Sequence, residues 1–247
     1  MNRLQRPVLD HVAIGTRVLA DGWQLFGGLL GGTWAFGGDS PGYWWGQLQF
    51  ASGPMIELLT PTGGPDAGFL ERFLAGRGAG PHHFNFHVPD IEATLARVRN
   101  LGIEPVGVSL ANARWQEAFL HPKTAHGIVI QVAQQSGPAP DLPAPDELPA
   151  PGAPSVLTLV EHRVADLDGA VQLFEQVLEG DVVRRDAAAA ELAWDNGGRI
   201  RLVLDAAVPL GTIGELHFSR LAGPLWPGDA AHARHLAERL GVTLRVS

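Results

Sequence analysis

Cysteine is absent from this 247-residue sequence. Its absence excludes a disulfide framework and a thiol nucleophile, and it restricts any metal site to histidine, carboxylate and amide ligands. Basic residues are scarce too: 18 Lys and Arg stand against 26 Asp and Glu, which gives a net charge of −8. Because a nucleic-acid-binding protein needs a basic face, we expect no nucleic-acid partner.

Long apolar runs are also missing. No stretch reaches the length of a membrane span, and residues 1–7 lack the apolar core of a signal peptide. We therefore expect a cytoplasmic protein that does not enter a membrane. Hydrophobic residues still make up 45% of the chain, which is enough for a core, and the length favours two modest domains over one.

A histidine-bearing strand followed by a helix dominates the pattern. Phe84, Phe86 and Val88 recur at every second position over residues 82–88, which predicts a strand. Asp90 then predicts the N-cap of a helix that runs to residue 101, because apolar residues recur there at helical spacing. A similar short strand near the N-terminus, residues 9–14, also carries a histidine and is also followed by an apolar helical run.

Two copies of one unit fill the first half of the chain. In each copy a strand and a helix are followed by three strands, the order β-α-β-β-β. The strands and the helix of the first copy are predicted at 8–14, 21–30 (helix), 34–36, 43–50 and 54–59. Those of the second copy are predicted at 82–88, 90–101 (helix), 106–110, 115–120 and 127–132. Such an internal repeat has to be recognised before a fold is assigned.

Residues 136–155 interrupt the pattern with seven prolines among alanines and acidic residues, which predicts an extended linker. The unit then begins again, with strands and helices predicted at 156–164, 166–178 (helix), 182–184, 191–194, 200–204, 215–219, 229–240 (helix) and 242–246. The fourth copy is incomplete. We predict a complete domain over 1–135, a linker over 136–155, and a degenerate, incomplete second domain over 156–247.

The sequence resembles the vicinal oxygen chelate superfamily, which contains glyoxalase I, methylmalonyl-CoA epimerase, extradiol dioxygenases and antibiotic-resistance proteins. The resemblance rests on Leu-Asp-His-Val-Ala-Ile around His11, Ile-Glu-Leu-Leu-Thr-Pro around Glu57, His-His-Phe around His83, and Ile-Val-Ile-Gln-Val around Gln131. It covers residues 8–133 well and the rest in outline, and it is greatest to the epimerase branch. It implies an α+β fold in which tandem β-α-β-β-β units form cupped mixed sheets around one divalent metal ion.

By position, the resemblance implies that His11, Glu57, His83 and Gln131 are the metal ligands. The residues themselves support a bound cation. Burying a carboxylate such as that of Glu57 on an apolar strand face costs roughly several kcal/mol unless the carboxylate is paired or bound to a cation. The alternative to a metal site is that these four residues are ordinary polar side chains whose hydrogen bonds are satisfied at the edges of strands. Two imidazoles with oxygen donors suit Zn, Co, Ni, Mn or Fe. Strand alternation puts His82 on the opposite face, which favours His83.

A small-molecule substrate is expected in the cup, bound by side chains from both copies. The candidates are Tyr43, Trp45, His87, Trp115, Phe119 and Lys123. Each has a simpler alternative: aromatic residues of strands usually belong to a core, His87 could be an exposed strand end, and Lys123 could be a solvated residue of a turn.

Two departures from the epimerase pattern restrict the reactions that the site could catalyse. The resemblance implies two carboxylate bases, but one position holds Gln131, which cannot accept a proton near neutral pH, and residues 43–47 contain no acid for the other. We favour a metal-dependent isomerase, epimerase or lyase in which Glu57 is the catalytic group and the metal stabilises an enolate of a small carbonyl or thioester substrate. The alternatives are an Fe(II) extradiol-type dioxygenase, suggested by the two histidines and one carboxylate, and a non-catalytic binding or resistance protein.

The C-terminal half is predicted to hold no metal. When Asp166 is aligned with Asp90, Leu159 replaces His83. Arg201 is the polar residue within the apolar strand at 200–204, and a cation is no metal ligand. His217 lacks partners in the sequence pattern. We expect this half to complete the fold or to form the contact of a homodimer.

Overall fold

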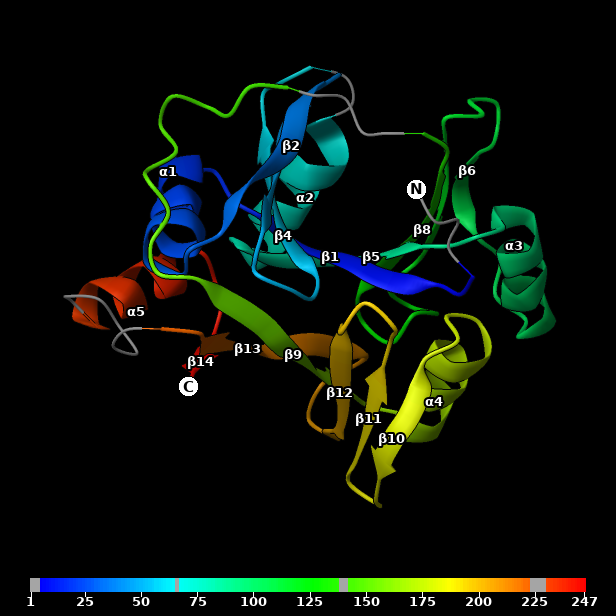
Figure 1. The fold of residues 1–247 in the computed structure, drawn as a ribbon. Coiled ribbons are helices and arrows are strands. Elements are labelled where there is room, and N and C mark those ends of the chain that lie inside the picture. The colour runs from blue at the N-terminus through cyan, green and yellow to red at the C-terminus, as the bar shows by residue number, and fades with distance from the viewer. Residues whose placement is uncertain (1–4, 65–66, 138–141, 223–229) are drawn as a thin grey trace. The chain divides into compact units, whose positions relative to one another are not determined.

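A computed structural model describes residues 5–64, 67–137, 142–222 and 230–247. Its strands form two curled mixed sheets (Figure 1), so the predicted α+β class with β-α-β-β-β units is confirmed. One sheet has eight strands in the order β2-β3-β4-β1-β5-β8-β7-β6, and the other has six in the order β10-β11-β12-β9-β13-β14. Every helix among the described residues is too short or too polar to cross a membrane.

The strands are β1 (Val8–Gly15), β2 (Thr33–Ser40), β3 (Tyr43–Gln49), β4 (Met55–Pro61), β5 (Gly80–His87), β6 (Val106–Ser109), β7 (Trp115–Leu120), β8 (Val129–Gln135), β9 (Ser155–Val164), β10 (Asp181–Arg185), β11 (Ala189–Ala193), β12 (Arg199–Leu204), β13 (Gly211–Arg220) and β14 (Leu244–Val246). The helices are α1 (Leu19–Gly22), the π-helix η1 (Trp23–Leu29), α2 (Gly68–Arg77), α3 (Ile91–Asn100), α4 (Leu167–Gln176) and α5 (Ala230–Arg239). Their order repeats the predicted unit three times and part of it a fourth time.

The chain divides into two compact units. The first consists of Met1–Asp10, His83–Pro138 and Leu159–Gly214, and the second of His11–His82, Ala139–Thr158 and Glu215–Ser247. Each unit therefore draws on the chain both before and after the proline-rich segment. The division into sequence domains at 136–155 stays a proposal.

The junctions between strand and helix form where the sequence predicts them. Asp90 is the N-cap of α3, and its Oδ1 accepts a hydrogen bond from the N–H of Ala93 at 2.9 Å. Asp166 is the N-cap of α4 in the same way, and its Oδ1 accepts a hydrogen bond from the N–H of Gly169 at 3.0 Å. Each aspartate satisfies an N–H group that has no partner within its own helix.

The helix predicted over residues 21–30 has a different form. The single turn α1 continues into the π-helix η1, whose last turn is closed by a hydrogen bond from the N–H of Leu30 to the oxygen of Leu25 at 3.0 Å. The spacing of five residues is that of a π-turn, which is rarer than an α-turn. Gly27 and Gly28 lie in this segment and weaken the α-helical propensity that its apolar residues suggest.

The proline-rich segment packs against this helix instead of acting as a free linker. Residues 142–154 form no helix or strand, as predicted, and residues 138–141 of the predicted linker lie outside the described residues. However, the N–H of Gly152 donates to the oxygen of Gly27 at 3.2 Å, and the indole N–H of Trp34 donates to the oxygen of Leu142 at 2.9 Å. The hydroxyl of Ser155, where β9 begins, donates to the oxygen of Leu30. We call residues 142–154 the strap.

Gly31→Ala is expected to destabilise the protein by roughly 2–4 kcal/mol. Gly31 has φ +72°, and a Cβ there would lie 2.3 Å from the oxygen of Ala153 in the strap. The matched control is Gly63→Ala, because Gly63 has φ +84° but no atom within 4 Å of a Cβ. Only the backbone cost of roughly 1–2 kcal/mol should apply to the control. Urea unfolding of both variants measures the difference, and equal destabilisation would contradict close packing of the strap.

A buried histidine ties β9 to the turn before β8. His162 is fully buried, and its Nε2 lies 2.9 Å from the oxygen of His126. Its ring also packs edge-on against Phe84, with centroids 5.7 Å apart. Burial lowers the pKa of His162 to about 4, from an ordinary value of 6.5.

His162→Gln should therefore make the protein less sensitive to acid. In the unfolded chain the imidazole of His162 takes up a proton near pH 6.5, whereas the folded protein resists protonation down to about 4. Stability is then fully present above pH 6.5 and falls as the pH drops toward 4, by up to about 3 kcal/mol. We expect the glutamine variant to lose much less between pH 7 and 4.5 in urea unfolding, while the exposed control His235→Gln should follow the parent. A parallel loss in His162→Gln would contradict this assignment.

Candidate functional site

The first copy of the repeat has one apolar and one polar strand face. β1 pairs parallel with β4, with Ala13 opposite Glu57, and β3 pairs antiparallel with β4, with Gln47 opposite the same glutamate. Because side chains alternate along a strand, His11, Glu57 and Gln47 share one face. The other face presents Val12, Ile14, Leu48, Ile56 and Leu58, all of which are fully buried.

His11, Glu57 and Gln47 form a compact buried cluster. The amide N–H group of Gln47 donates to Glu57 Oε2 at 2.8 Å and lies 3.1 Å from His11 Nδ1. His11 Nε2 lies 3.5 Å from Glu57 Oε1. The three residues are at most 6% exposed. Gln47 thus holds both the histidine and the carboxylate in place from the adjacent strand.

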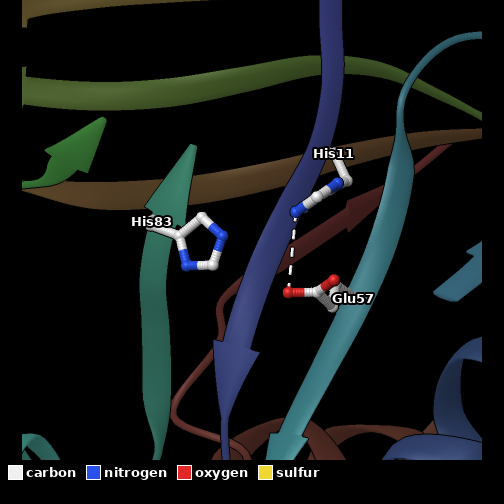
Figure 2. Close-up of side chains that lie close together, drawn as sticks. All are labelled: His11, Glu57 and His83. Atoms are coloured by element: carbon white, nitrogen blue, oxygen red, sulfur yellow. Dashed lines mark ion pairs between the residues drawn. The ribbon is translucent and has the colours of Figure 1, made fainter. Parts of the chain in front are cut away.

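His83 of β5 completes a candidate metal centre. His11, Glu57 and His83 each offer one ligand atom, and these atoms lie within 4.8 Å of one another. Figure 2 shows the three side chains close together. All three residues are buried. Two imidazoles and one carboxylate suit Zn or Fe(II) and related divalent ions.

An orphaned polar atom supports the fit of a cation. The Oε1 atom of Gln47 is buried and has no hydrogen-bond partner among the described residues. A buried oxygen without a donor costs about 1–3 kcal/mol, and a nearby positive ion offsets that cost. Together with the buried carboxylate of Glu57, it makes this part of the sheet chemically suited to a divalent metal.

His82, the neighbour of His83, lies in different surroundings. Its ring packs against Phe73, with centroids 4.8 Å apart, and against Phe69 at 5.5 Å. Burial and the positive charge of Arg77 lower the pKa of His82 to about 4. These contacts agree with the strand alternation that favours His83 as the ligand.

The second copy also has a polar strand face. His83, Asn85 and His87 of β5 alternate with Phe84 and Phe86, which are fully buried. In the parallel pair, Asn85 lies opposite Gln131 of β8. In the antiparallel pair of β7 and β8, the face is continued by three residues of β7, which are Trp115, Glu117 and Phe119.

A chain of hydrogen bonds crosses this face. The amide of Asn85 donates to Gln131 Oε1 at 2.8 Å, and the amide of Gln131 donates to Glu117 Oε2 at 2.7 Å. The indole N–H of Trp115 donates to the same carboxylate oxygen at 2.8 Å. Gln131 Oε1 has a second lone pair besides the one that accepts the hydrogen bond from Asn85. These hydrogen bonds are therefore compatible with the proposed role of Gln131 as the fourth metal ligand.

Glu117 and Gln47 are site residues that the sequence analysis missed. A signal was present, because Glu117 lies midway between Trp115 and Phe119, and alternation puts the three side chains on one face. The partner of its carboxylate, Gln131, is on another strand, and pairing register cannot be read from one strand alone.

The predicted substrate-binding residues of the second copy lie in three settings. His87 Nδ1 is 3.4 Å from Asp10 Oδ1, and its ring lies edge-on to Trp115 with centroids 5.7 Å apart. Phe119 is half-buried opposite Gln131. Lys123 is exposed in a turn, as its position in the sequence suggests, and its backbone N–H donates to His121 Nδ1 at 3.2 Å.

The two candidates from the first copy have packing roles. Tyr43 and Trp45 lie on the face of Glu57 and pack against a buried cluster of Ala13, Leu59, Leu70 and Leu74. The Tyr43 ring is also edge-on to Phe69, with centroids 5.3 Å apart. Their proposed contact with a substrate would be made from the border of this cluster.

His217 in the second half has partners, contrary to the sequence-based expectation. Its Nε2 is 3.2 Å from Glu215 Oε2, and one ligand atom each of Glu161, Glu215 and His217 lie within 4.8 Å of one another. The expectation was wrong because the sequence pattern did not reveal which carboxylates the strands bring together. Arginines already balance both carboxylates: Arg245 is 3.0 Å from Glu215, and Arg163 is 3.4 Å from Glu161. The absence of a metal from this half stays our prediction.

Comparison with known proteins finds a family match in the first half of the chain. Residues 10–119 match the model of the glyoxalase/bleomycin resistance protein/dioxygenase superfamily. The predicted resemblance to the vicinal oxygen chelate superfamily is thereby confirmed. No curated protein matches the chain.

Solved structures extend the likeness in fold. A hypothetical protein from Staphylococcus aureus is similar over 98% of this chain and 99% of its own, with a TM-score of 0.64 and 13% identity. Methylmalonyl-CoA epimerase from Mycobacterium tuberculosis is similar over 53% of this chain and 89% of its own, with a TM-score of 0.47 and 25% identity. The Streptomyces coelicolor epimerase, solved with 2-nitronate-propionyl-CoA, is similar over 53% and 98%, with a TM-score of 0.47 and 22% identity. At 13% identity, the Staphylococcus structure establishes the fold alone.

Proposed function

We propose that this protein is a divalent-metal-dependent isomerase, epimerase or lyase that acts on a small carbonyl or thioester compound. The observation that carries this proposal is the buried group of His11, Glu57 and His83, whose ligand atoms lie within 4.8 Å of one another. The match of residues 10–119 to a superfamily that includes many enzymes such as epimerases supports it. The proposed substrate is a small molecule, and neither nucleic acid nor membrane is needed.

In this proposal His11, Glu57, His83 and Gln131 hold one ion of Zn, Co, Ni, Mn or Fe. A bound divalent ion polarises a carbonyl oxygen and makes the neighbouring C–H bond more acidic. Gln47 orients His11 and Glu57 through the bonds at 3.1 Å and 2.8 Å. Glu57 is the proposed catalytic carboxylate, since it can hold a proton beside the acidic carbon.

A second candidate function is an Fe(II) extradiol-type dioxygenase. The same two histidines and one carboxylate favour it, because that donor set is common in oxygen-activating iron enzymes. In the dioxygenases of this superfamily, the resemblance puts the carboxylate at the position of Gln131 and not of Glu57. The difference in position favours the isomerase.

One experiment separates the classes. The full-length protein, purified without added metal, is analysed for its metal content and then incubated in D₂O with 2-oxo acids, thioesters and catechols. Deuterium incorporation at an α-carbon supports the isomerase class, and oxygen consumption with a catechol supports the dioxygenase. Ligand binding that survives chelation, without any turnover, would overturn both in favour of a non-catalytic binding protein.

A further inference from the structure

The proposed fourth metal ligand, Gln131, has an amide whose two ends are chemically different. The oxygen can bind a divalent ion, whereas the NH₂ group only donates hydrogen bonds. The two ends are similar in size, so the hydrogen-bond partners of the amide decide which end faces the site. Those partners are Asn85 of β5 and Glu117 of β7.

Glu117 determines the direction of the amide from one side. Its Oε2 atom accepts hydrogen bonds from the NH₂ group of Gln131 at 2.7 Å and from the indole N–H of Trp115 at 2.8 Å. Because a carboxylate only accepts hydrogen bonds, the end of Gln131 that faces it must be the NH₂ group. Reversal of the amide would bring its oxygen against the carboxylate oxygen and would remove a charge-assisted hydrogen bond.

Asn85 holds the oxygen end of the same amide. Asn85 is fully buried, and its NH₂ group donates to Gln131 Oε1 at 2.8 Å. Its own Oδ1 atom is buried without a hydrogen-bond partner among the described residues, at a cost of about 1–3 kcal/mol. Asn85 thus donates to Gln131 although its oxygen stays unsatisfied, as expected if Glu117 imposes the direction of the whole chain of hydrogen bonds.

The internal repeat relates Gln131 to His83. In the first copy, Glu57 lies opposite the residue two positions after His11, and its Oε1 is 3.5 Å from His11 Nε2. In the second copy, Gln131 lies opposite Asn85, which is two positions after His83. The same register of parallel strands brings the side chain of Gln131 diagonally beside His83 on one face of the sheet.

The two copies differ at the positions around this ligand. In the first copy, Ala13 has the register position of Asn85, and Trp45 has that of Glu117. The ligand of the first copy is Glu57, a carboxylate that offers an oxygen at either end, so the choice of end has no consequence there. The pair of Asn85 and Glu117 occurs in the copy whose proposed ligand is an amide.

We propose that Glu117 is a positioning residue, which together with Asn85 fixes the amide of Gln131 so that its oxygen, and not its NH₂ group, faces the divalent ion. This inference rests on the proposed function, because it concerns the fourth ligand of that metal site. Glu117 acts only as a hydrogen-bond acceptor in this role. An amide held in one orientation offers its oxygen without first having to rotate, so the ion should bind more tightly.

The test is Glu117→Gln in the full-length protein, with Co²⁺ as the probe and its visible spectrum as the readout. A glutamine has nearly the same shape but can turn either end toward Gln131, so the direction of the amide is no longer fixed. We expect the affinity for Co²⁺ to fall roughly 10–100-fold. Urea unfolding of the metal-free protein checks that the variant folds. The matched control is Glu92→Gln, at an exposed position of α3, which should bind Co²⁺ as the parent does.

A second pair of variants separates positioning from a general structural role. After Gln131→Glu, both ends of the ligand side chain are oxygens, and its orientation has no consequence. Adding Glu117→Gln to that variant should leave the affinity for Co²⁺ unchanged or raise it, because the addition removes a neighbouring like charge. A loss of equal size with and without Gln131→Glu would show that Glu117 only supports the fold, and the positioning role would be wrong.

The parent protein separates a failure of this role from a failure of the proposed function. If the parent binds Co²⁺ and Glu117→Gln binds it equally tightly, Glu117 does not position the ligand, while the proposed metal site stands. If the parent binds no Co²⁺, the proposed function fails, and the positioning role of Glu117 fails with it.

Discussion

Replacing His11 or His83 with alanine should remove the bound divalent ion. The parent is expected to hold about one ion per chain, because three buried ligand atoms lie within 4.8 Å of one another. Loss of one imidazole leaves too few donors for a stable site, so we expect the affinity to fall by about 100-fold or more. Elemental analysis after dialysis, and titration with Co²⁺ followed by its visible spectrum, measure the change.

The control for this prediction is His82→Ala. His82 packs against Phe73 and Phe69 and is adjacent in sequence to His83, so the variant tests whether any nearby histidine matters. It should keep its metal. Gln47→Leu should give an intermediate result, a loss of about 10–100-fold, because Gln47 orients two ligands without being one. Full occupancy in His83→Ala would rule out the assigned ligand set.

Gln131→Glu should change or confer proton transfer at an acidic α-carbon. The amide nitrogen of Gln131 lies 2.7 Å from Glu117 Oε2, so the substitution would bring two carboxylate oxygens to hydrogen-bonding distance. Like charges this close cannot both persist, and the pair is expected to share one proton and to titrate as a coupled pair. A glutamate at the fourth metal position is also the arrangement that the epimerase resemblance implies.

We expect this variant to exchange α-protons of thioesters up to roughly 10²-fold faster than the parent, with a changed pH–rate profile. Gln172→Glu, at an exposed position of α4, adds the same charge outside the candidate site and serves as the control. If the parent already epimerises methylmalonyl-CoA at an enzyme-like rate and Gln131→Glu changes nothing, the argument from the missing carboxylate is wrong.

The sequence by itself determined the repeated unit and the faces of its strands. Alternation around Glu57 and around Phe84 and Phe86 separates polar from apolar faces without any knowledge of neighbours. Asp90 caps its helix through a bond to a residue three positions later, which is a local interaction. The order of strands and helices followed from these local patterns, because hydrophobic periodicity and caps are properties of short segments. The fold class with its cupped sheets was implied by the resemblance to the vicinal oxygen chelate superfamily.

The tertiary structure alone decided the contacts between segments far apart in the chain. The strap packs on the η1 segment because Gly31 leaves room for its backbone and Gly27 leaves room for the Leu148 side chain. No property of the proline-rich segment alone predicts that contact. Glu117 meets Gln131 through the register of two strands. His217 of β13 and Glu161 of β9 are likewise brought close together only by the sheet. Such pairs depend on register and packing between distant residues, and a pattern within one segment carries no information about them.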